Sequence, residues 1–524
     1  MKRIIQTLAF SLAIGSAALA ANERPNIIVL LTDDQSLNSL GCYGNPQVST
    51  PHIDRLGEQG IIFDSHYDNT SICKAARATI MTGMQEYKTG CNFTRGPLIR
   101  KKWEQSYPVL LRKAGYYTGF AGKFGFPVTD DLKAGGGYHT NNEMPMGSFD
   151  VWFGWPGQGS YKTAENEFVA HYADKYPHST RALGAASQDF IQQARKTGKP
   201  FCLSVSFKAP HGPTSPDKDY DSVYADTVWE IGENYDEVGA AHLPQQAKSG
   251  RQYLSILEFR PETFQKKMRA YQQTIYGVDV AVGMIREELE RQGIVDNTVI
   301  IFTSDNGYNC GAHGFSGKVL PYEEGSGVPM IVYDPRHPNS NRGLRSQAVT
   351  GSIDIAPTVM DLAGLPDIEN ADGASLLPLI DNPHSRVRDA MALINVWGNV
   401  PTHSFAVVTD SAKYIYWFFE GEGMKAAEEL YHLGKDRQEM NNLVKNPEYQ
   451  SMLQEMREHY DQALLDWKNE TVPDSGYPDY VTLFDQDIAW NDKAALIKPK
   501  QIENYRKAVA SSKAPKQKKA NKSK

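Results

Sequence analysis

Three continuous apolar runs that each end in polar residues constrain the fold of this chain of 524 residues most strongly. They are "NIIVLLT" (26–32) before Asp33 and Asp34, "FCLSVSF" (201–207) before "KAPHGP", and "TVIIFTS" (298–304) before "DNG". Runs of this length that are rich in β-branched residues are typical of strands buried on both faces of a parallel sheet. The sequence therefore predicts a buried sheet whose strands end in residues capable of chemistry.

A long amphipathic helix is predicted between the last two runs. Apolar residues recur there every three or four positions, at Met268, Tyr271, Ile275, Val278, Val282, Ile285 and Leu289. Strands that alternate with helices indicate the α/β class. Ligands of such sheets bind at the carboxyl ends of the strands. The polar residues expected to converge at that edge are Asp33, Asp34, His211, Asp305 and Asn306.

The acidic residues at this edge indicate a cation. Two carboxylates brought close together repel each other by roughly 4 kcal/mol at an effective dielectric constant of about 20, and a cation reverses that sign. Oxygen ligands from Asp and Asn, without histidine or paired thiolates, suit Ca²⁺ or Mg²⁺ better than zinc. For each motif alone an alternative stays open, in which Asp33 and Asp34 cap a helix and "DNG" forms a turn.

The first twenty residues have the pattern of a secretory signal peptide. Lys2 and Arg3 precede a short apolar stretch that ends in Ala18-Leu19-Ala20, and no later segment is long and apolar enough to span a bilayer. Removal of Lys2 and Arg3 changes the formal net charge from −7 to −9, which argues against a nucleic-acid partner. We therefore expect an exported protein, periplasmic or extracellular.

The cysteines are few and odd in number, which argues against a disulfide framework in an exported chain, although one or two bridges remain an alternative. They are Cys42, Cys73, Cys91, Cys202 and Cys310. Cys73 differs from the others because it lies in "SICKAARATIMTG" (71–83), a run of small residues at the expected start of a helix, four positions before Arg77. This thiol requires its own explanation.

Taken together, these motifs resemble the type I sulfatases of the alkaline phosphatase superfamily. In that family the cysteine of a Cys-x-(Pro/Ala)-x-Arg motif is oxidised after translation to formylglycine (3-oxoalanine), and the motif here is Cys73-Lys74-Ala75-Ala76-Arg77. The resemblance extends to about residue 468 and includes "RPNIIVLLTDDQ", "TPHIDRLGEQGIIFDSHY", "GYYTGFAGK", "APHGP", "TSDNG", "HGFSGK" and "LYHLGKDRQEMNNL". It implies an α/β fold with a large mixed sheet flanked by helices, and a smaller C-terminal antiparallel sheet with a helix.

The resemblance also implies a role for each motif residue. The ligands of a calcium ion, or less favourably of Mg²⁺, would be Asp33, Asp34, Asp305, Asn306 and the modified Cys73. Arg77 would orient the formylglycine, Lys123 and Lys318 would bind sulfate oxygens, His211 would protonate the leaving alcohol, and His313 is a further candidate for substrate binding. An implied partner is a formylglycine-generating enzyme or an anaerobic sulfatase-maturating enzyme; Ala75, where other members have proline, bears on which of them accepts the site.

The chemistry of that family explains these residue types. One hydroxyl of the aldehyde hydrate attacks sulfur, and the other later collapses the hemiacetal and expels sulfate. The metal lowers the pKa of the attacking hydroxyl, and the cationic side chains stabilise charge on the sulfuryl oxygens. A sugar alkoxide leaves poorly, because the pKa of its alcohol is about 16, near that of water, so a proton must arrive as the bond breaks.

One departure from the family pattern lies beside the expected active site. Many relatives have Gly-Lys-x-His, whereas this chain has Gly122-Lys123-Phe124-Gly125. The group that deprotonates the hemiacetal is therefore left open. His139 in "AGGGYHT" (134–140) is one candidate, and the alternative is that it is an exposed loop histidine.

The expected domain organisation follows the resemblance. Residues 1–20 are the signal peptide, 21–395 the catalytic domain, 396–500 the C-terminal subdomain, and 501–524 a basic tail expected to be disordered. Within the subdomain, "FAVVTD", "KYIYWFF" and "EELYHL" predict short strands and "PEYQSMLQEMREHYDQALLDW" predicts a helix.

The resulting interpretation is an exported sulfatase that acts on a sulfated carbohydrate, such as a polysaccharide, an oligosaccharide or a glycosaminoglycan. The aromatic stretch "FDVWFGWPGQGSY" (149–161) either stacks on sugar faces or belongs to the core. Two other functions stay open: a phosphate or phosphonate ester hydrolase of the same superfamily, and, if Cys73 is not converted, an inactive protein that binds sulfated glycans. The sugar and the sulfated position are not identified by the sequence.

Overall fold

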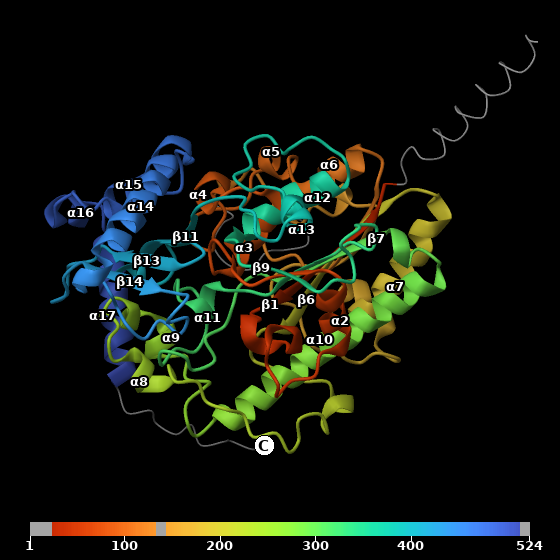
Figure 1. Ribbon diagram of the computed structural model, residues 1–524, viewed down its shortest axis with the longest axis horizontal. Coiled ribbons are helices and arrows are strands. Elements are labelled where there is room, and N and C mark those ends of the chain that lie inside the picture. The colour runs from red at the N-terminus through yellow and green to blue at the C-terminus, as the bar shows by residue number, and fades with distance from the viewer. Residues whose placement is uncertain (1–23, 133–142, 514–524) are drawn as a thin grey trace, which may run out of the picture.

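A mixed sheet of eight strands forms the larger part of the computed structural model, which describes residues 24–132 and 143–513 (Figure 1). The strand order is β5-β4-β6-β1-β7-β8-β2-β9, and β8 alone runs antiparallel to its neighbours. The strands are β1 (Asn26–Asp33), β2 (Ile61–Phe63), β4 (Tyr117–Lys123), β5 (Val151–Trp155), β6 (Phe201–Pro210), β7 (Thr298–Ser304), β8 (Met330–Tyr333) and β9 (Leu344–Ser346). The three predicted strands are thus β1, β6 and β7, and they are adjacent and parallel.

Helices cover both faces of this sheet, as expected for the α/β class (Figure 1). Ile28 and Leu30 of β1 face α2 (Pro51–Gln59), α7 (Ser179–Thr197) and α10 (Phe264–Arg291). Ile27, Val29 and Leu31 face the opposite way, toward α3 (Cys73–Thr82), α6 (Tyr107–Lys113) and α12 (Ile355–Leu362). Alternate residues of β1 therefore enter two cores, which explains why the run is apolar throughout.

The predicted amphipathic helix is α10. Six of its seven predicted stripe residues are fully buried, and Met268 packs against the same core while partly exposed. The other helices and short strands of the large domain are α4 (Glu86–Thr89), α5 (Arg100–Trp103), α8 (Asp236–Ala240), α9 (Arg251–Leu254), α11 (Glu323–Ser326), α13 (Leu377–Asp381), β3 (His66–Tyr67) and β10 (Thr350–Gly351). Within the described residues, no helix combines the length and apolar character needed to cross a membrane.

A second sheet of four antiparallel strands carries the C-terminal part. Its strands are β11 (Met391–Asn395), β12 (Ser404–Val408), β13 (Ala412–Trp417) and β14 (Ala427–His432). The predicted helix is α14 (Gln450–Glu470), and α15 (Pro478–Phe484), α16 (Trp490–Ala495) and α17 (Pro499–Lys513) follow it. The smaller antiparallel sheet with its helix is therefore present, but a boundary after residue 395 would separate β11 from β12.

The prediction of a disordered tail from residue 501 onward is wrong for the first half of that segment. Residues 501–513 belong to α17, where Ile502, Tyr505 and Val509 pack on the C-terminal core. Their spacing of three and four residues makes one apolar stripe, which is obscured when residues 501–513 are grouped with the lysine-rich end of the chain, 513–524. The signal peptide and residues 514–524 lie outside the described residues.

Two further alternatives are decided by burial and pairing. Phe149, Trp155 and Tyr161 of the aromatic stretch are buried, and Trp152 stacks on Phe120 with 5.1 Å between ring centroids. The aromatic side chains of this stretch therefore belong to the core and do not form a sugar-stacking surface.

All five cysteines are free, so the alternative of one or two disulfide bridges does not hold.

Candidate active site

The ends of β1 and β7 bring the predicted acidic residues together. Asp33 is the last residue of β1 and Asp34 follows it, while Asp305 and Asn306 follow β7 directly. The side-chain amide of Asn306 donates to Asp34 Oδ1 at 2.5 Å, and the backbone N–H of Asp34 donates to Asp305 Oδ1 at 3.3 Å. The convergence expected from the strand ends is therefore confirmed.

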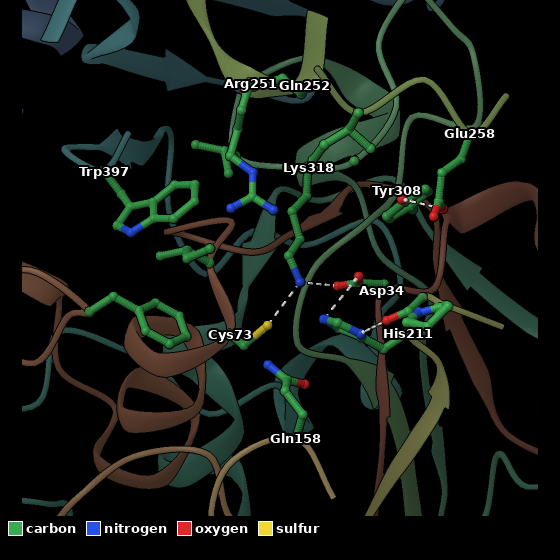
Figure 2. A pocket seen from close by; sticks show the side chains of 17 residues that line it. Asp34, Cys73, Gln158, His211, Arg251, Gln252, Glu258, Tyr308, Lys318 and Trp397 are labelled. Atoms are coloured by element: carbon green, nitrogen blue, oxygen red, sulfur yellow. Dashed lines mark hydrogen bonds and ion pairs between the residues drawn. The ribbon is translucent and has the colours of Figure 1, made fainter. Parts of the chain in front are cut away.

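Cys73 is the first residue of α3 and lies at the floor of a pocket beside these carboxylates (Figure 2). Its Sγ lies 2.8 Å from Lys318 Nζ and 3.5 Å from Asp33 Oδ1. Burial raises the pKa of the Cys73 thiol to about 12 even though Lys123 and Lys318 lower it. An unmodified Cys73 is thus a neutral thiol and a poor nucleophile.

Arg77 lies one turn further along α3 and joins the ends of several strands. Its Nε donates to Asp305 Oδ2 at 2.8 Å, and one terminal nitrogen donates to the backbone oxygen of Lys123 at 2.7 Å and to the Ser206 hydroxyl. The other terminal nitrogen lies 3.8 Å from Asp33 Oδ2. Arg77 therefore fixes the arrangement of Asp33 and Asp305 from beneath the pocket.

The two predicted lysines take different positions. Lys318 lines the pocket and contacts Asp34 Oδ1 as well as Cys73, whereas Lys123 is 1% exposed and lies beneath it, with Nζ 2.6 Å from Asp33 Oδ2. Burial alone would raise the pKa of Asp33, but Lys123 first, then His211, Arg77 and Lys318, hold it well below its usual range. Burial and the charge of Asp33 raise the pKa of Asp305 to about 6.

His211 follows β6 and lines the same pocket. Its Nδ1 lies 2.6 Å from the backbone oxygen of Gly212, to which an Nδ1–H would donate, and its Nε2 lies 3.8 Å from Asp34 Oδ2. Burial lowers the pKa of His211 to about 4, although Asp33 and Asp34 act in the opposite direction. With this tautomer, Nε2 is the nitrogen available to exchange a proton with a ligand.

The pocket itself has a volume of about 470 Å³. Besides the predicted residues its walls contain side chains that sequence analysis did not identify as functional: Phe93, Gln158, Arg251, Gln252, Glu258, Tyr308 and Trp397. These residues come from separate loops and from the short helix α9, and none of them belongs to a recognisable motif. Gln158 is the only member of the 149–161 stretch among the described pocket-lining residues.

His313 does not reach this pocket, so its assignment to substrate binding is wrong. The side chain is fully buried, with Nδ1 3.0 Å from the backbone oxygen of Gly239 and Nε2 3.8 Å from the Glu324 carboxylate. The ring centroid of His313 lies 5.1 Å from that of Tyr322. Although His313 lies close to "SGK" in the sequence, its side chain is in the core and not among the pocket-lining residues, and its backbone has a φ of +53°.

Gly125, at the position of the family histidine, has a structural reason to lack a side chain. Its φ is +92°, and a Cβ there would lie 2.6 Å from Cδ of Arg77. A histidine therefore does not fit while Arg77 holds Asp305. The alternative base His139 lies outside the described residues.

A matched pair of substitutions tests this packing. Gly115 has almost the same φ, +96°, but a Cβ there would meet nothing within 4 Å. We expect Gly125→Ala to lower the free energy of unfolding by about 1–3 kcal/mol more than Gly115→Ala, because only the former displaces Arg77. Urea denaturation measures the difference, and equal losses in the two variants would show that backbone strain alone matters.

The donor set fits a hard divalent cation. Ligand atoms of Asp33, Asp34, Cys73 and His211 all lie within 4.8 Å of one another. Asn306 Oδ1 is buried and has no hydrogen-bond partner among the described residues, although a buried carbonyl oxygen usually has one. Carboxylate and amide oxygens are the ligands that Ca²⁺ and Mg²⁺ prefer.

Comparison with known families agrees with the motifs. A family model described as "Sulfatase" matches residues 25–365, and one described as "N-sulphoglucosamine sulphohydrolase, C-terminal" matches residues 311–465. An N-acetylglucosamine-6-O-sulfatase of Bacteroides thetaiotaomicron is 27% identical over 545 residues, covering 90% of this chain and 92% of that protein. The human N-acetylglucosamine-6-sulfatase is 30% identical over 383 residues, covering 69% of this chain and 65% of that protein.

Solved structures with the same fold include hydrolases of more than one kind. A protein whose structure is described as a complex with its substrate D-glucosamine-2-N,6-O-disulfate aligns with a TM-score of 0.70 and 23% identity, over 85% of this chain and 99% of that chain. The phosphonate monoester hydrolase of Agrobacterium radiobacter aligns with a TM-score of 0.69 and 20% identity, over 86% of this chain and 96% of that chain. At these identities the likeness concerns the fold.

Proposed function

The chain belongs to the sulfatase family of sulfuric ester hydrolases, and from this we propose that it is an exported enzyme that removes sulfate from carbohydrate monoesters. We further propose that Cys73 is the site of conversion to formylglycine and that the acidic residues beside it hold one Ca²⁺ ion. Formylglycine would supply a hydroxyl nucleophile as its hydrate, and the cation would supply positive charge at the sulfate group.

One observation supports the proposal more than any other, namely the position of Cys73. A thiol at the first turn of a helix, 2.8 Å from Lys318 Nζ and 3.5 Å from Asp33 Oδ1, lies at the floor of an open pocket. Burial keeps the thiol protonated, so thiolate chemistry does not account for the site. Conversion of Cβ to an aldehyde carbon, followed by addition of water, would place a hydroxyl nucleophile at the same point.

The cations around Cys73 are suited to a sulfate ester. Lys318 reaches the pocket from one side, and Lys123 and Arg77 lie below, where they hold Asp33 and Asp305 in place. Fixed positive charge of this kind, in a partly enclosed site, stabilises negative charge that builds on sulfuryl oxygens. Lys318 would bind an oxygen directly, while Arg77 would act as a positioning residue.

His211 is suited to transfer a proton to the leaving alcohol. An Nδ1–H directed to Gly212 O leaves Nε2 as the atom that carries the transferred proton. His211 is neutral at ordinary pH because burial lowers its pKa to about 4, and a bound sulfate ester would favour the protonated form by its negative charge. The same ring would then accept and return one proton in each cycle.

The divalent cation would be held by Asp33, Asp34, Asp305 and Asn306, with residue 73 as a further contact. Asp305 Oδ2 is occupied by Arg77, so Asp305 would contribute Oδ1. Asn306 would contribute Oδ1, which is buried and lacks a hydrogen-bond partner among the described residues, while its amide nitrogen faces Asp34 Oδ1 when no cation is bound.

This assignment predicts a selective effect of Asn306→Ala. The variant removes one oxygen ligand without changing the charge of the site, so we expect Ca²⁺ affinity to fall about tenfold. Isothermal titration calorimetry of the metal-free protein with Ca²⁺ measures the change. Asn309→Ala, in the same loop but outside the proposed ligand set, is the control; equal affinities in Asn306→Ala and the wild type would remove Asn306 from the ligand set.

The substrate class is proposed from two sources. Relatives that align over most of this chain carry names of N-acetylglucosamine-6-sulfatases, which act on carbohydrate sulfates. The pattern of residues 1–20 supports export, where sulfated polysaccharides and glycosaminoglycans occur, and conversion of Cys73 would require a formylglycine-generating or anaerobic sulfatase-maturating enzyme as a partner.

A direct test uses the full chain produced together with a maturating enzyme. Release of inorganic sulfate from a panel of sulfated monosaccharides and disaccharides is measured beside release of phosphate from the corresponding phosphate esters. The proposal expects kcat/KM for sulfate esters to exceed that for phosphate and phosphonate esters. The reverse order would favour a phosphate or phosphonate hydrolase, and absence of turnover with unmodified Cys73 in the mass spectrum would favour a glycan-binding protein.

A further inference from the structure

Arg251 is a cation in the pocket wall that the proposed hydrolysis of a single sulfate does not use. It is the first residue of α9, and its guanidinium carbon lies 5.4 Å from the ring centroid of Trp397. Figure 2 shows the guanidinium pointing into the pocket between Trp397 and Lys318, on the side away from Glu258. Across residues 24–132 and 143–513, no carboxylate forms an ion pair with it.

The backbone that carries Arg251 is fixed relative to the loop that carries Lys318. The carbonyl oxygen of Arg251 accepts hydrogen bonds from the backbone N–H groups of Ser255 and Ile256, at 2.9 and 2.8 Å. The carbonyl oxygen of Gln252 accepts one from the backbone N–H of Ser316, two residues before Lys318, at 2.9 Å. The position of Arg251 relative to Lys318 is therefore set by protein contacts and not by a ligand.

The loop of Trp397 is tied to the same segment. The side-chain amide of Asn399 donates to the backbone oxygen of Ser249 at 2.8 Å, and the Trp397 ring packs at a tilt against Phe93, with 6.3 Å between ring centroids. A guanidinium that lies over an indole ring keeps its N–H groups free, because they point outward in the plane of the guanidinium. There they can bind a planar or tetrahedral anion. Trp397 thus orients Arg251 without neutralising it.

The opposite wall of the pocket has the opposite charge. The Glu258 carboxylate lies 3.4 Å from the Tyr308 hydroxyl and 3.8 Å from Lys267 Nζ, and it faces the pocket (Figure 2). An anionic ligand group is attracted toward Arg251 and repelled by Glu258, whereas hydroxyl or amino groups are accepted beside Glu258. The pocket therefore favours one orientation of a ligand with unevenly distributed charge.

We propose that Arg251, oriented by Trp397, binds a second anionic group of the substrate, so that the enzyme prefers carbohydrates with a sulfate or carboxylate in addition to the sulfate that is removed. This inference rests on the proposed function, because the first sulfate must lie at Cys73 and Lys318. It adds a specificity-determining residue and narrows the substrate class to polyanionic saccharides. Both a second sulfate and a uronic acid carboxylate supply the required negative charge.

The test compares three substrates with the same cleaved sulfate. One is a monosulfated neutral sugar, one carries a second sulfate, and one is joined to a uronic acid. For the wild type we expect kcat/KM to be higher for at least one dianionic substrate than for the monosulfated one. Comparison of the two dianionic substrates shows whether the second anionic group is a sulfate or a carboxylate. The quantity of interest is this ratio of kcat/KM values.

In Arg251→Gln the ratio is expected to fall on the order of 10- to 100-fold, because a charge-assisted hydrogen bond to the second anion is lost. The loss should lie mainly in KM, since Arg251 is not at the reacting atoms. Arg251→Lys keeps the charge without the planar fork and should retain part of the ratio. Arg506→Gln, which removes an exposed charge on α17, should leave the ratio unchanged.

The outcomes separate this inference from the proposed function. If the wild type releases no sulfate from any of the three substrates, the proposed function fails. If the wild type releases sulfate but Arg251→Gln and the wild type show the same ratio, the proposed function stands and the role of Arg251 is overturned. A ratio that falls equally in Arg506→Gln would attribute the effect to net charge and would also overturn it.

Discussion

Cys73→Ala is expected to abolish sulfate ester hydrolysis, with a fall in kcat on the order of 10⁴-fold or more. The variant has no sulfur to oxidise and hence no aldehyde, and the neighbouring Lys318 and Asp33 remain in ion pairs with Asp34 and Lys123 and do not replace the nucleophile. Folding should persist, since shortening a buried cysteine side chain to the methyl group of alanine costs only about 1 kcal/mol.

Cys202→Ala is the matched control. Cys202 is equally buried but lies near the start of β6 and packs in the core, away from the pocket, so its replacement should leave turnover unchanged. Initial rates, thermal denaturation, and mass spectrometry of the peptide that contains residue 73 together make the test. Full turnover in Cys73→Ala, or an active wild-type protein whose Cys73 is entirely unmodified, would refute the formylglycine proposal.

His211→Ala is expected to slow esters of sugar alcohols by about 10²–10⁴-fold and esters of activated phenols far less. The difference arises because a phenolate of low basicity departs without a proton, whereas a sugar alkoxide requires one. His211 is placed for this transfer, with Nε2 available at the pocket wall. Parallel kinetics on a sugar sulfate and on a nitrophenyl sulfate measure the effect.

Two comparisons sharpen this test. Lys123→Ala should slow both kinds of ester, because it disturbs Asp33, which is common to the reaction of every substrate. His337→Ala, at an ion pair with Asp381 remote from the pocket, should slow neither. Equal losses on sugar and phenol esters in His211→Ala would exclude proton donation to the leaving group and leave sulfate binding as its role.

The parts of the site that sequence could predict are those tied to strand ends. An apolar run in the sequence predicts each of β1, β6 and β7. Because β1 pairs in parallel with both β6 and β7, the residues at the ends of these strands meet at one edge of the sheet: Asp33, Asp34, His211 and Asp305. That rule uses only local pattern and a property shared by all parallel sheets. The positions of Cys73 and Lys318 required the resemblance to a family as well.

The pocket wall could not be predicted in this way. Phe93, Trp397 and the segment that carries Arg251 and Glu258 lie far apart in the sequence, in loops and in the short helix α9, and meet only through tertiary packing. His313 shows the converse error, since this residue lies near a motif in the sequence but has its side chain buried in the core, beside Gly239 and Glu324. The C-terminal helix α17 was missed because its composition suggested disorder while its three apolar residues carried the helical signal.

The contacts of Arg77 have a consequence for how the protein becomes active during folding. Its partners Lys123, Ser206 and Asp305 are 46, 129 and 228 residues away in the chain. Lys123 ends β4, Ser206 lies within β6, and Asp305 follows β7. Contacts between such distant residues form late, after long stretches of chain have been ordered. No early compact state with only local structure can hold Asp33 and Asp305 in place, so the geometry of the active site, as distinct from the conversion of Cys73, requires the completed sheet.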